Sequence, residues 1–295
     1  MPVRLFLPRH GTTLGKLREG GGALEPFDAT KPNIARVYDY WLGGKDNFAP
    51  DRDLAERLLE IYPLAAQVAQ ENRQFLSRAV AYVTRQGVTQ FIDVGAGLPT
   101  VLNTHDVAQH AEPTARVAYV DNDPVVISHA CAILARDAGV VVVAGDMRDP
   151  ASILASPALI AEIDLGRPVA VMLAGVLHFL PAGTARDVVR EFTSRIAPGS
   201  YVIISVGTGS DGIAERFSRA YTAAPLSLHR RDEITRFLDG LELVPPGLIE
   251  ARAWPDGPGG APGPAGAPGT AGAPGPAPAR DVTLLAAVAR TPGSS

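Results

Sequence analysis

The chain has 295 residues, of which 46% are hydrophobic and 20% are charged, with a formal net charge of -4. This length suits one large α/β domain with additions or two small domains, and the balanced charge excludes a globally basic nucleic-acid binder. The single cysteine, Cys131, excludes a disulfide framework and a cysteine-built metal site. We therefore expect no metal and a reducing, cytoplasmic location. No window approaches ~20 consecutive apolar residues, so no membrane-spanning helix is expected.

Residues 1–27 begin with a short apolar stretch, but glycines and basic residues follow it. Because this segment lacks the continuous apolar run of a signal peptide, we predict a flexible leader.

Residues 28–87 have the periodicity of helices and are predicted to form an N-terminal helical cap. The first helix is predicted to begin with Thr30 as its N-cap. A second is expected over residues 51–61 and a third over 64–87. A polar, glycine-containing turn at 43–47 separates the first two helices.

From residue 88 onward, short apolar runs alternate with helical stretches, which indicates a parallel sheet with helices on both faces. The strands are predicted at residues 90–94, 116–120, 140–144, 169–174, 200–206 and 281–289. The helices are predicted at 124–138, 150–161 and 183–195, with a weaker one after Pro99. Residues 255–280 are almost wholly Gly, Pro and Ala, and such a segment is predicted to be a disordered loop.

In open α/β sheets, ligands bind beyond the carboxyl ends of the strands, so the residues there are the candidate site. The first strand ends in Asp93-Val94-Gly95-Ala96-Gly97, where two glycines let backbone N–H groups approach a ligand closely. The second strand ends in Asp121-Asn122, and a carboxylate at this spacing suits two ribose hydroxyls. Ordinary glycine turns and helix caps would leave similar residues at these positions.

The third and fourth strands end in two further polar groups. Asp146 and Met147 follow the third strand, where a carboxylate and a backbone N–H can recognise adenine; Asp is also common in turns. The fourth strand ends at Ala174, and His178 follows it. His178 either faces the site and moves a proton or is a hydrogen-bonded core histidine. The ordered acidic strand ends together describe a pocket for an adenosine that carries a sulfonium and an amino-acid tail.

These strand ends resemble the ordered motifs of class I methyltransferases that depend on S-adenosylmethionine (SAM). More narrowly, the chain resembles an actinobacterial S-adenosyl methyltransferase family formerly catalogued as a domain of unknown function. The resemblance spans roughly residues 27–254 and resumes at Val282; its matching segments are residues 33–48, 72–73, 90–100, 119–124, 167–169, 177–179 and 198–201. The departures are the leader, the 255–280 segment and the C-terminus.

The resemblance implies a Rossmann-like, doubly wound, seven-stranded sheet with an antiparallel last strand, a helical cap over 28–87 and a methyltransferase domain over 88–295. It implies SAM as the cofactor. We assign Asp121 to the ribose, and Asp146 and Met147 to adenine; Asn122, next to Asp121, is counted among the cofactor-binding residues. We assign Gly95 and Gly97 to backbone approach, and Asp93 to the amino end of the methionine moiety. Ala174 is also counted among the cofactor-binding residues.

Cations and polar groups of the cap complete the predicted site. Arg73 or Lys45 could pair with the carboxylate of SAM, and Asn47 lies in the same glycine turn as Lys45. Tyr38 and Trp41 lie on the apolar stripe of the first helix with Ile34 and Leu42, and they are expected to belong to the core. Tyr40 lies off this stripe, so we expect it to contribute to a wall of the acceptor pocket and count it as a candidate catalytic residue. Solvated surface positions are the alternative for both cations.

Three functions remain open from the sequence. A SAM-dependent methyltransferase with a small-molecule acceptor is the preferred one, because no motif for nucleic-acid base methylation occurs. A SAM-binding regulatory protein without catalysis is an alternative. An NAD-dependent dehydrogenase is disfavoured, because Thr100 replaces the third glycine of the dinucleotide fingerprint and Pro99 precedes it. No nucleic-acid or membrane partner is expected, and the sequence does not define the oligomeric state.

Overall fold

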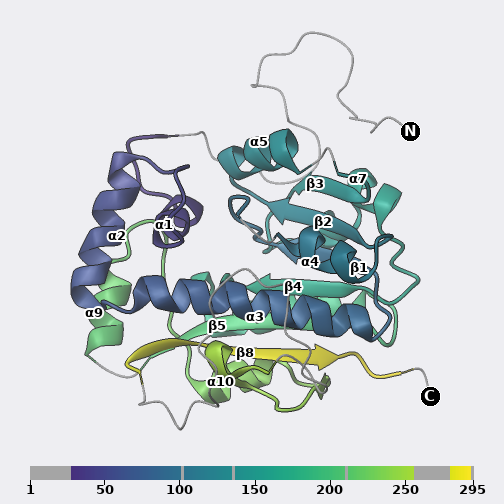
Figure 1. Ribbon diagram of the computed structural model, residues 1–295. Helices are drawn as coiled ribbons and strands as arrows, with labels where there is room; N and C mark the ends of the chain where they lie inside the picture. Colours follow the sequence, from purple (N-terminus) through teal and green to yellow (C-terminus); the bar gives the residue numbers. More distant parts are fainter. Residues whose placement is uncertain (1–27, 101–102, 135–136, 210–211, 256–279, 294–295) are drawn as a thin grey trace.

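A computed structural model describes residues 28–100, 103–134, 137–209, 212–255 and 280–293. The predicted leader and nearly all of the predicted loop at 255–280 lie outside these residues. Within them, one central sheet is flanked by helices on both faces (Figure 1). The predicted α/β class is confirmed.

The strands follow the order β3-β2-β1-β4-β5-β8-β6, and a short β7 pairs with β8 beside this path. Strands β1 to β5 pair in parallel, and β8 runs antiparallel to β5. This path of seven strands with an antiparallel β8 is the predicted arrangement. The bounds of the strands are β1 Gln90–Val94, β2 Arg116–Asp121, β3 Val140–Ala144, β4 Ala170–Ala174, β5 Tyr201–Gly209, β6 Glu242–Leu243, β7 Ile249–Glu250 and β8 Val282–Arg290.

Burial on both faces explains the near-continuous apolar runs of the central strands. All five residues of β1 are buried, and the nine-residue strand β8 exposes only Arg290. Two apolar layers result: α6, α7, α8 and α10 pack on one face of the sheet. Helices α3, α4 and α5 pack on the other face. Such two-sided cover is typical of parallel sheets.

The helices are α1 Ile34–Trp41, α2 Ala49–Ile61, α3 Ala65–Arg85, α4 Thr104–Ala111, α5 Pro124–Ile133, α6 Pro150–Leu154, α7 Pro157–Glu162, α8 Ala182–Ser194, α9 Ile213–Ala220 and α10 Arg231–Phe237. The single helix predicted over 150–161 is wrong, because the chain breaks at Ser156 into α6 and α7. Pro157 disfavours a helical conformation at the residue before it, which ends the first helix. The N-cap predicted at Thr30 is also wrong: Asn33 caps α1 by accepting from two backbone N–H groups.

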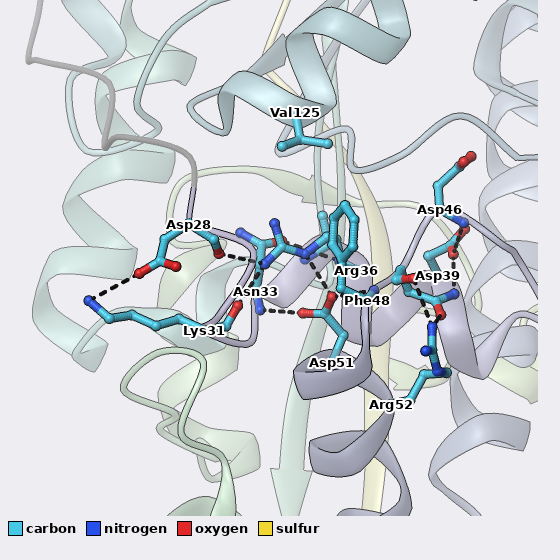
Figure 2. A network of polar contacts seen from close by, with 12 residues as sticks. Asp28, Lys31, Asn33, Arg36, Asp39, Asp46, Phe48, Asp51, Arg52 and Val125 are labelled. Carbon is cyan, nitrogen blue, oxygen red and sulfur yellow. Dashed lines mark hydrogen bonds and ion pairs between the residues drawn. The ribbon is translucent and has the colours of Figure 1, made fainter.

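A buried ion pair fixes α1 against α2. Arg36 Nε donates to Asp51 Oδ2 over 2.8 Å, and the two side chains are 3% and 0% exposed. The same carboxylate accepts from the backbone N–H groups of Asn33 and Phe48, each at 2.8 Å (Figure 2). Because this pair is surrounded by hydrogen bonds, the carboxylate is well compensated inside the protein. The N-terminal segment is thus an ordered part of the fold from Asn33 onward.

Helices α1 and α2 form a third apolar cluster with α9, away from the two layers on the sheet. Helix α3 instead runs across one sheet face, and its N-terminal residues also join this third cluster (Figure 1). The third cluster therefore stands at the end of the sheet where α1, α9 and the start of α3 meet.

Candidate active site

Two glycines shape the turn after β1. Gly95 and Gly97 have φ angles of +72° and +67°, which lie in the left-handed region that favours glycine. A Cβ atom at Gly95 would overlap Val176 Cγ1, whereas a Cβ at Gly97 would meet no atom within 4 Å. Gly95 is therefore needed for close packing on the loop after β4. Gly97 instead exposes its backbone to open space.

Asp121, the last residue of β2, is hydrogen-bonded to this turn. Its Oδ2 accepts from the N–H of Gly97 at 3.0 Å, and its Oδ1 accepts from the N–H of Asp123 at 2.9 Å. Burial raises the pKa of Asp121 to about 6, although these backbone N–H groups favour its charged form. Each carboxylate oxygen retains a lone pair for a further donor, so Asp121 can accept from two hydroxyls of a ligand.

Asp93 and Arg73 form the next part of the site. Asp93 is 6% exposed and accepts from Thr104 Oγ1 at 2.7 Å. Burial raises its pKa, and the hydrogen bond from Thr104 and the charge of Arg73 oppose that rise. Arg73, on α3, donates to Thr100 Oγ1 at 2.7 Å. The two opposite charges interact with each other and line the same cavity, where they can bind the charged groups of an amino-acid tail.

A cavity of about 260 Å³ lies above the strand ends, below α1 and beside α3. This volume is close to the lower end of small-ligand sites, roughly 300–1,000 Å³. The predicted site residues that line it are Arg73, Asp93, Gly95, Gly97, Asp121, Asn122, Met147, Ala174 and His178. Predicted residues from the ends of four strands and from α3 thus meet around one space.

The sequence profile of a family described as "S-adenosyl methyltransferase" matches residues 21–291. The chain belongs to this family. It is similar to a DUF574 family protein from Streptomyces avermitilis, with 35% identity over 90% of this chain and 99% of that one, and a TM-score of 0.79. It is also similar to a protein from Thermobifida fusca with a provisional methyltransferase designation, at 36% identity over 90% and 96% of the two chains and a TM-score of 0.78. No curated protein matches the chain.

The protein is a SAM-dependent methyltransferase, and its methyl acceptor is unidentified. The dehydrogenase alternative has no support. The donor set fits SAM: Asp121 is a partly buried carboxylate without a cationic partner among the described residues, and Gly97 offers a cradle that a side chain would occupy. Asn72, which also lines the cavity, has a buried Oδ1 without a hydrogen-bond partner in the described part of the chain. Within that part, no helix combines the length and apolar character needed to cross a membrane.

Asp146 of the methyltransferase does not line the cavity, although its neighbours Gly145 and Met147 do. Its carboxylate is held by Arg148, whose Nε donates to Asp146 Oδ1 at 2.9 Å. Burial by itself would raise the pKa of Asp146, but the hydrogen bonds and charge of Arg148 outweigh it and lower the pKa. The side chain predicted to bind adenine is thus turned to a local ion pair that sequence spacing did not reveal.

The 43–47 turn also does not line the cavity, so Lys45 and Asn47 are not brought to the predicted cofactor site. The buried carboxylate of Asp39 holds this turn: Asp39 Oδ2 accepts from the backbone of Asp46 at 3.0 Å and from Asn47 Nδ2 at 2.8 Å (Figure 2). Of the two turn residues predicted to meet the ligand, Asn47 is used instead to close α1 and Lys45 is exposed.

Tyr40 points away from the cavity as well. Its hydroxyl donates to Glu56 of α2, and it is absent from the cavity lining. Tyr38 and Trp41, which the apolar stripe assigned to the core, line the cavity instead. The Tyr38 hydroxyl donates to the carbonyl of Ala69 at 3.0 Å and accepts from Asn72 Nδ2 at 3.1 Å. The stripe identified the inward face of α1 but could not distinguish a packed face from one that borders a cavity.

His178 lines the cavity, but its hydrogen bond argues against the predicted role in proton transfer. The backbone N–H of Gly207 donates to His178 Nδ1 at 3.0 Å, which assigns the ring proton to Nε2. Burial, and secondly the nearby His229, lower the pKa of His178 to about 3. At neutral pH the imidazole is therefore uncharged, its Nδ1 lone pair is occupied, and its remaining polar group is a donor.

Proposed function

We propose that this enzyme methylates a small molecule bound inside the cavity, next to SAM. The supporting observation is a buried wall of the cavity: three of the aromatic side chains that line it, Tyr62, Phe217 and Tyr221, are 5%, 6% and 7% exposed. A macromolecular acceptor would need its reactive group to be presented at an open surface. A small molecule can be enclosed, which also keeps water from the methyl group.

In this proposal the strand ends hold the cofactor. Asp121 accepts from the ribose hydroxyls, and the backbone at Gly95 and Gly97 approaches the methionine moiety. Arg73 binds the carboxylate of that moiety and Asp93 binds its ammonium, so each protein charge pairs with an opposite charge of the ligand. The pKa of Asp93 is raised by burial, and a bound ammonium would favour its charged form.

The cavity wall near Gly145 and Met147 is then left for adenine, with Asn122 beside the ribose. We also propose that the cap, residues 28–87, covers the site through a direct link: Asn33 of α1 donates to Asp123, which caps α5 by accepting from Val125. Both residues of this link line the cavity.

SAM supplies a methyl group that its sulfonium makes electrophilic, so the cofactor holds the reactive chemistry. The chain has to align the acceptor, exclude water and bind both molecules at once. The neutral His178 does not supply a base through Nδ1, since Gly207 occupies that atom. We propose the cytoplasm as the compartment, since the free Cys131 is exposed and would persist in a reducing environment.

The proposal is tested with SAM that carries a labelled methyl group. An actinobacterial cell extract is separated by ultrafiltration into a small-molecule and a macromolecular fraction, and each is incubated with the purified enzyme. Label is expected in the small-molecule fraction. Asp149→Asn, at a helix cap outside the cavity, should act like the wild type, whereas Asp121→Ala should transfer little label. Label confined to the macromolecular fraction would reject a small-molecule acceptor.

A further inference from the structure

The cavity has two halves of different chemistry. Among the described residues that line it, the charged ones are Arg73, Asp93, Asp121 and Asp123. All four belong to α3 or to the ends of β1 and β2. The charged half of the cavity therefore coincides with the part assigned above to SAM.

The second half lies over β5 and β8, on the other side of β4. The antiparallel register pairs Gly209 with Val282 and Gly207 with Leu284, so the start of β8 lies at the carboxyl end of β5. Four strand spacings separate β2 from β8 in the sheet, or about 19 Å at about 4.8 Å per step. The lining therefore extends well beyond the strand ends that would hold the ribose.

Aromatic and aliphatic side chains line this second half, which we call the apolar chamber; its aromatic members are Tyr38, Trp41, Tyr62, Phe179, Phe217 and Tyr221. They come from α1, the end of α2, α9 and the loop after β4, and all of them except Tyr38 are linked by ring contacts. The ring centroids of Trp41 and Phe217 lie 6.3 Å apart, and those of Phe179 and Tyr221 lie 5.7 Å apart. No described residue of the chamber is an aspartate, glutamate, lysine or arginine, so a charged ligand there would lack a partner.

Two polar groups of the chamber remain available as donors. A third, Trp41 Nε1, has no hydrogen-bond partner among the described residues, but it is buried and out of reach of a ligand. His178 carries its proton on Nε2, because Nδ1 accepts from Gly207. The hydroxyl of Tyr221 makes no hydrogen bond to any described residue, and burial is the sole cause of its raised pKa. A buried donor without a partner is costly, so a bound acceptor oxygen would be favourable here.

We propose that the methyl acceptor is an uncharged, ring-bearing molecule with a hydrogen-bond-accepting oxygen, bound in the apolar chamber between α1, α9 and the ends of β5 and β8. This inference rests on the proposed function, since it assigns the other half of the cavity to SAM. Aromatic side chains favour flat rings in offset or edge-to-face contacts. The donors then orient the ring by its oxygen, and the absence of charge discriminates against ionised analogues.

The test compares two probes of equal ring size by equilibrium dialysis against the full chain at saturating S-adenosylhomocysteine. The first, 2-acetylnaphthalene, is uncharged and has a carbonyl oxygen; the second, 2-naphthoate, has a carboxylate in its place. The uncharged probe is expected to bind at least about tenfold more tightly, because the chamber offers the carboxylate no cation. Equal binding, or a preference for 2-naphthoate, would overturn the inference.

A matched pair of variants locates the binding site. Leu226 lines the chamber from the partly exposed loop after α9, and Leu243 is exposed on β6 outside the cavity. Leu226→Arg should shift the ratio of the two affinities by about tenfold in favour of 2-naphthoate, because it places a cation at the chamber. Leu243→Arg should leave this ratio unchanged.

Binding of S-adenosylhomocysteine separates the possible failures. If the wild type binds it but shows no preference between the probes, the apolar chamber is not the acceptor site and the methyltransferase assignment is unaffected. If the wild type does not bind it, the proposed cofactor site fails instead. Should Leu226→Arg lose S-adenosylhomocysteine binding, the wild-type comparison of the two probes still decides the inference.

Discussion

The substitution Asp121→Asn is expected to stabilise the free protein while weakening its binding of S-adenosylhomocysteine. Burial raises the pKa of Asp121 to about 6, above the ordinary value of 3.8. That difference corresponds to about 3 kcal/mol of unfavourable free energy for the charged carboxylate in the folded state at neutral pH. Asparagine removes this charge. It can accept from only one of the N–H groups of Gly97 and Asp123, which costs about 1 kcal/mol.

The expected gain in the free energy of unfolding is therefore about 1–2 kcal/mol at neutral pH. The size of this gain depends on pH. Because the folded pKa of Asp121 lies above the unfolded one, the folded state retains its proton longer, so the wild type loses stability as the pH rises from about 4 to about 6. The advantage of asparagine should thus be small near pH 4 and complete near pH 7.

Urea unfolding of both proteins between about pH 4.5 and pH 7.5 measures this difference, and comparing them removes the contribution of other titrating groups. Calorimetry should show affinity for S-adenosylhomocysteine reduced by about 1.5–3 kcal/mol, the scale of hydrogen bonds to a charged group. Asp149→Asn is the control and should change neither quantity. A stability difference that does not vary with pH would refute the raised pKa, and unchanged affinity would remove Asp121 from the cofactor site.

Three further predictions concern the turn after β1 and the cap. Gly95→Ala should lower the free energy of unfolding by about 1–3 kcal/mol more than Gly97→Ala, because only a Cβ at Gly95 overlaps a neighbouring atom. Gly97→Ala should mainly weaken the binding of S-adenosylhomocysteine. Equal melting temperatures of the two variants would contradict this prediction. Asp51→Ala leaves Arg36 buried without its carboxylate and should cost about 3–5 kcal/mol in urea unfolding, and a loss below about 1 kcal/mol would show that the pair is dispensable. Hydrogen exchange at Gly43, Gly44 and Asp46, whose backbone N–H groups are hydrogen-bonded, should already be slow in the free protein and unchanged by S-adenosylhomocysteine. Strong added protection would mean that the turn closes on the ligand.

Local sequence patterns were sufficient to predict the sheet and its strand ends. The strands at 90–94 and 140–144 were predicted with the bounds that the structure has, because short apolar runs between turn residues leave few other assignments. The crossover rule then places the carboxyl ends of parallel strands at one edge. For this reason the amino-acid sequence alone was enough to bring Asp93, Gly97 and Asp121 together.

The tertiary structure decided which polar side chains remain available to a ligand. Asp146 and Asn47 sit where the sequence placed them, but Arg148 and Asp39 engage them, and such partners depend on rotamers rather than on spacing. The role of His178 likewise changed through one hydrogen bond, from Gly207, which is 29 residues away in the chain.

The acceptor half of the cavity was the least predictable part. Tyr38 and Trp41 were assigned to the core because they lie on the apolar stripe of α1, and a stripe has the same pattern whether it packs on protein or borders a cavity. The opposite wall comes from α9 and the start of β8, more than 170 residues further along the chain. The periodicity of apolar residues indicates which face of a single helix or strand is buried, but not what lies against that face. Only the packing of α1, α9 and β8 against one another determines that a space remains between them.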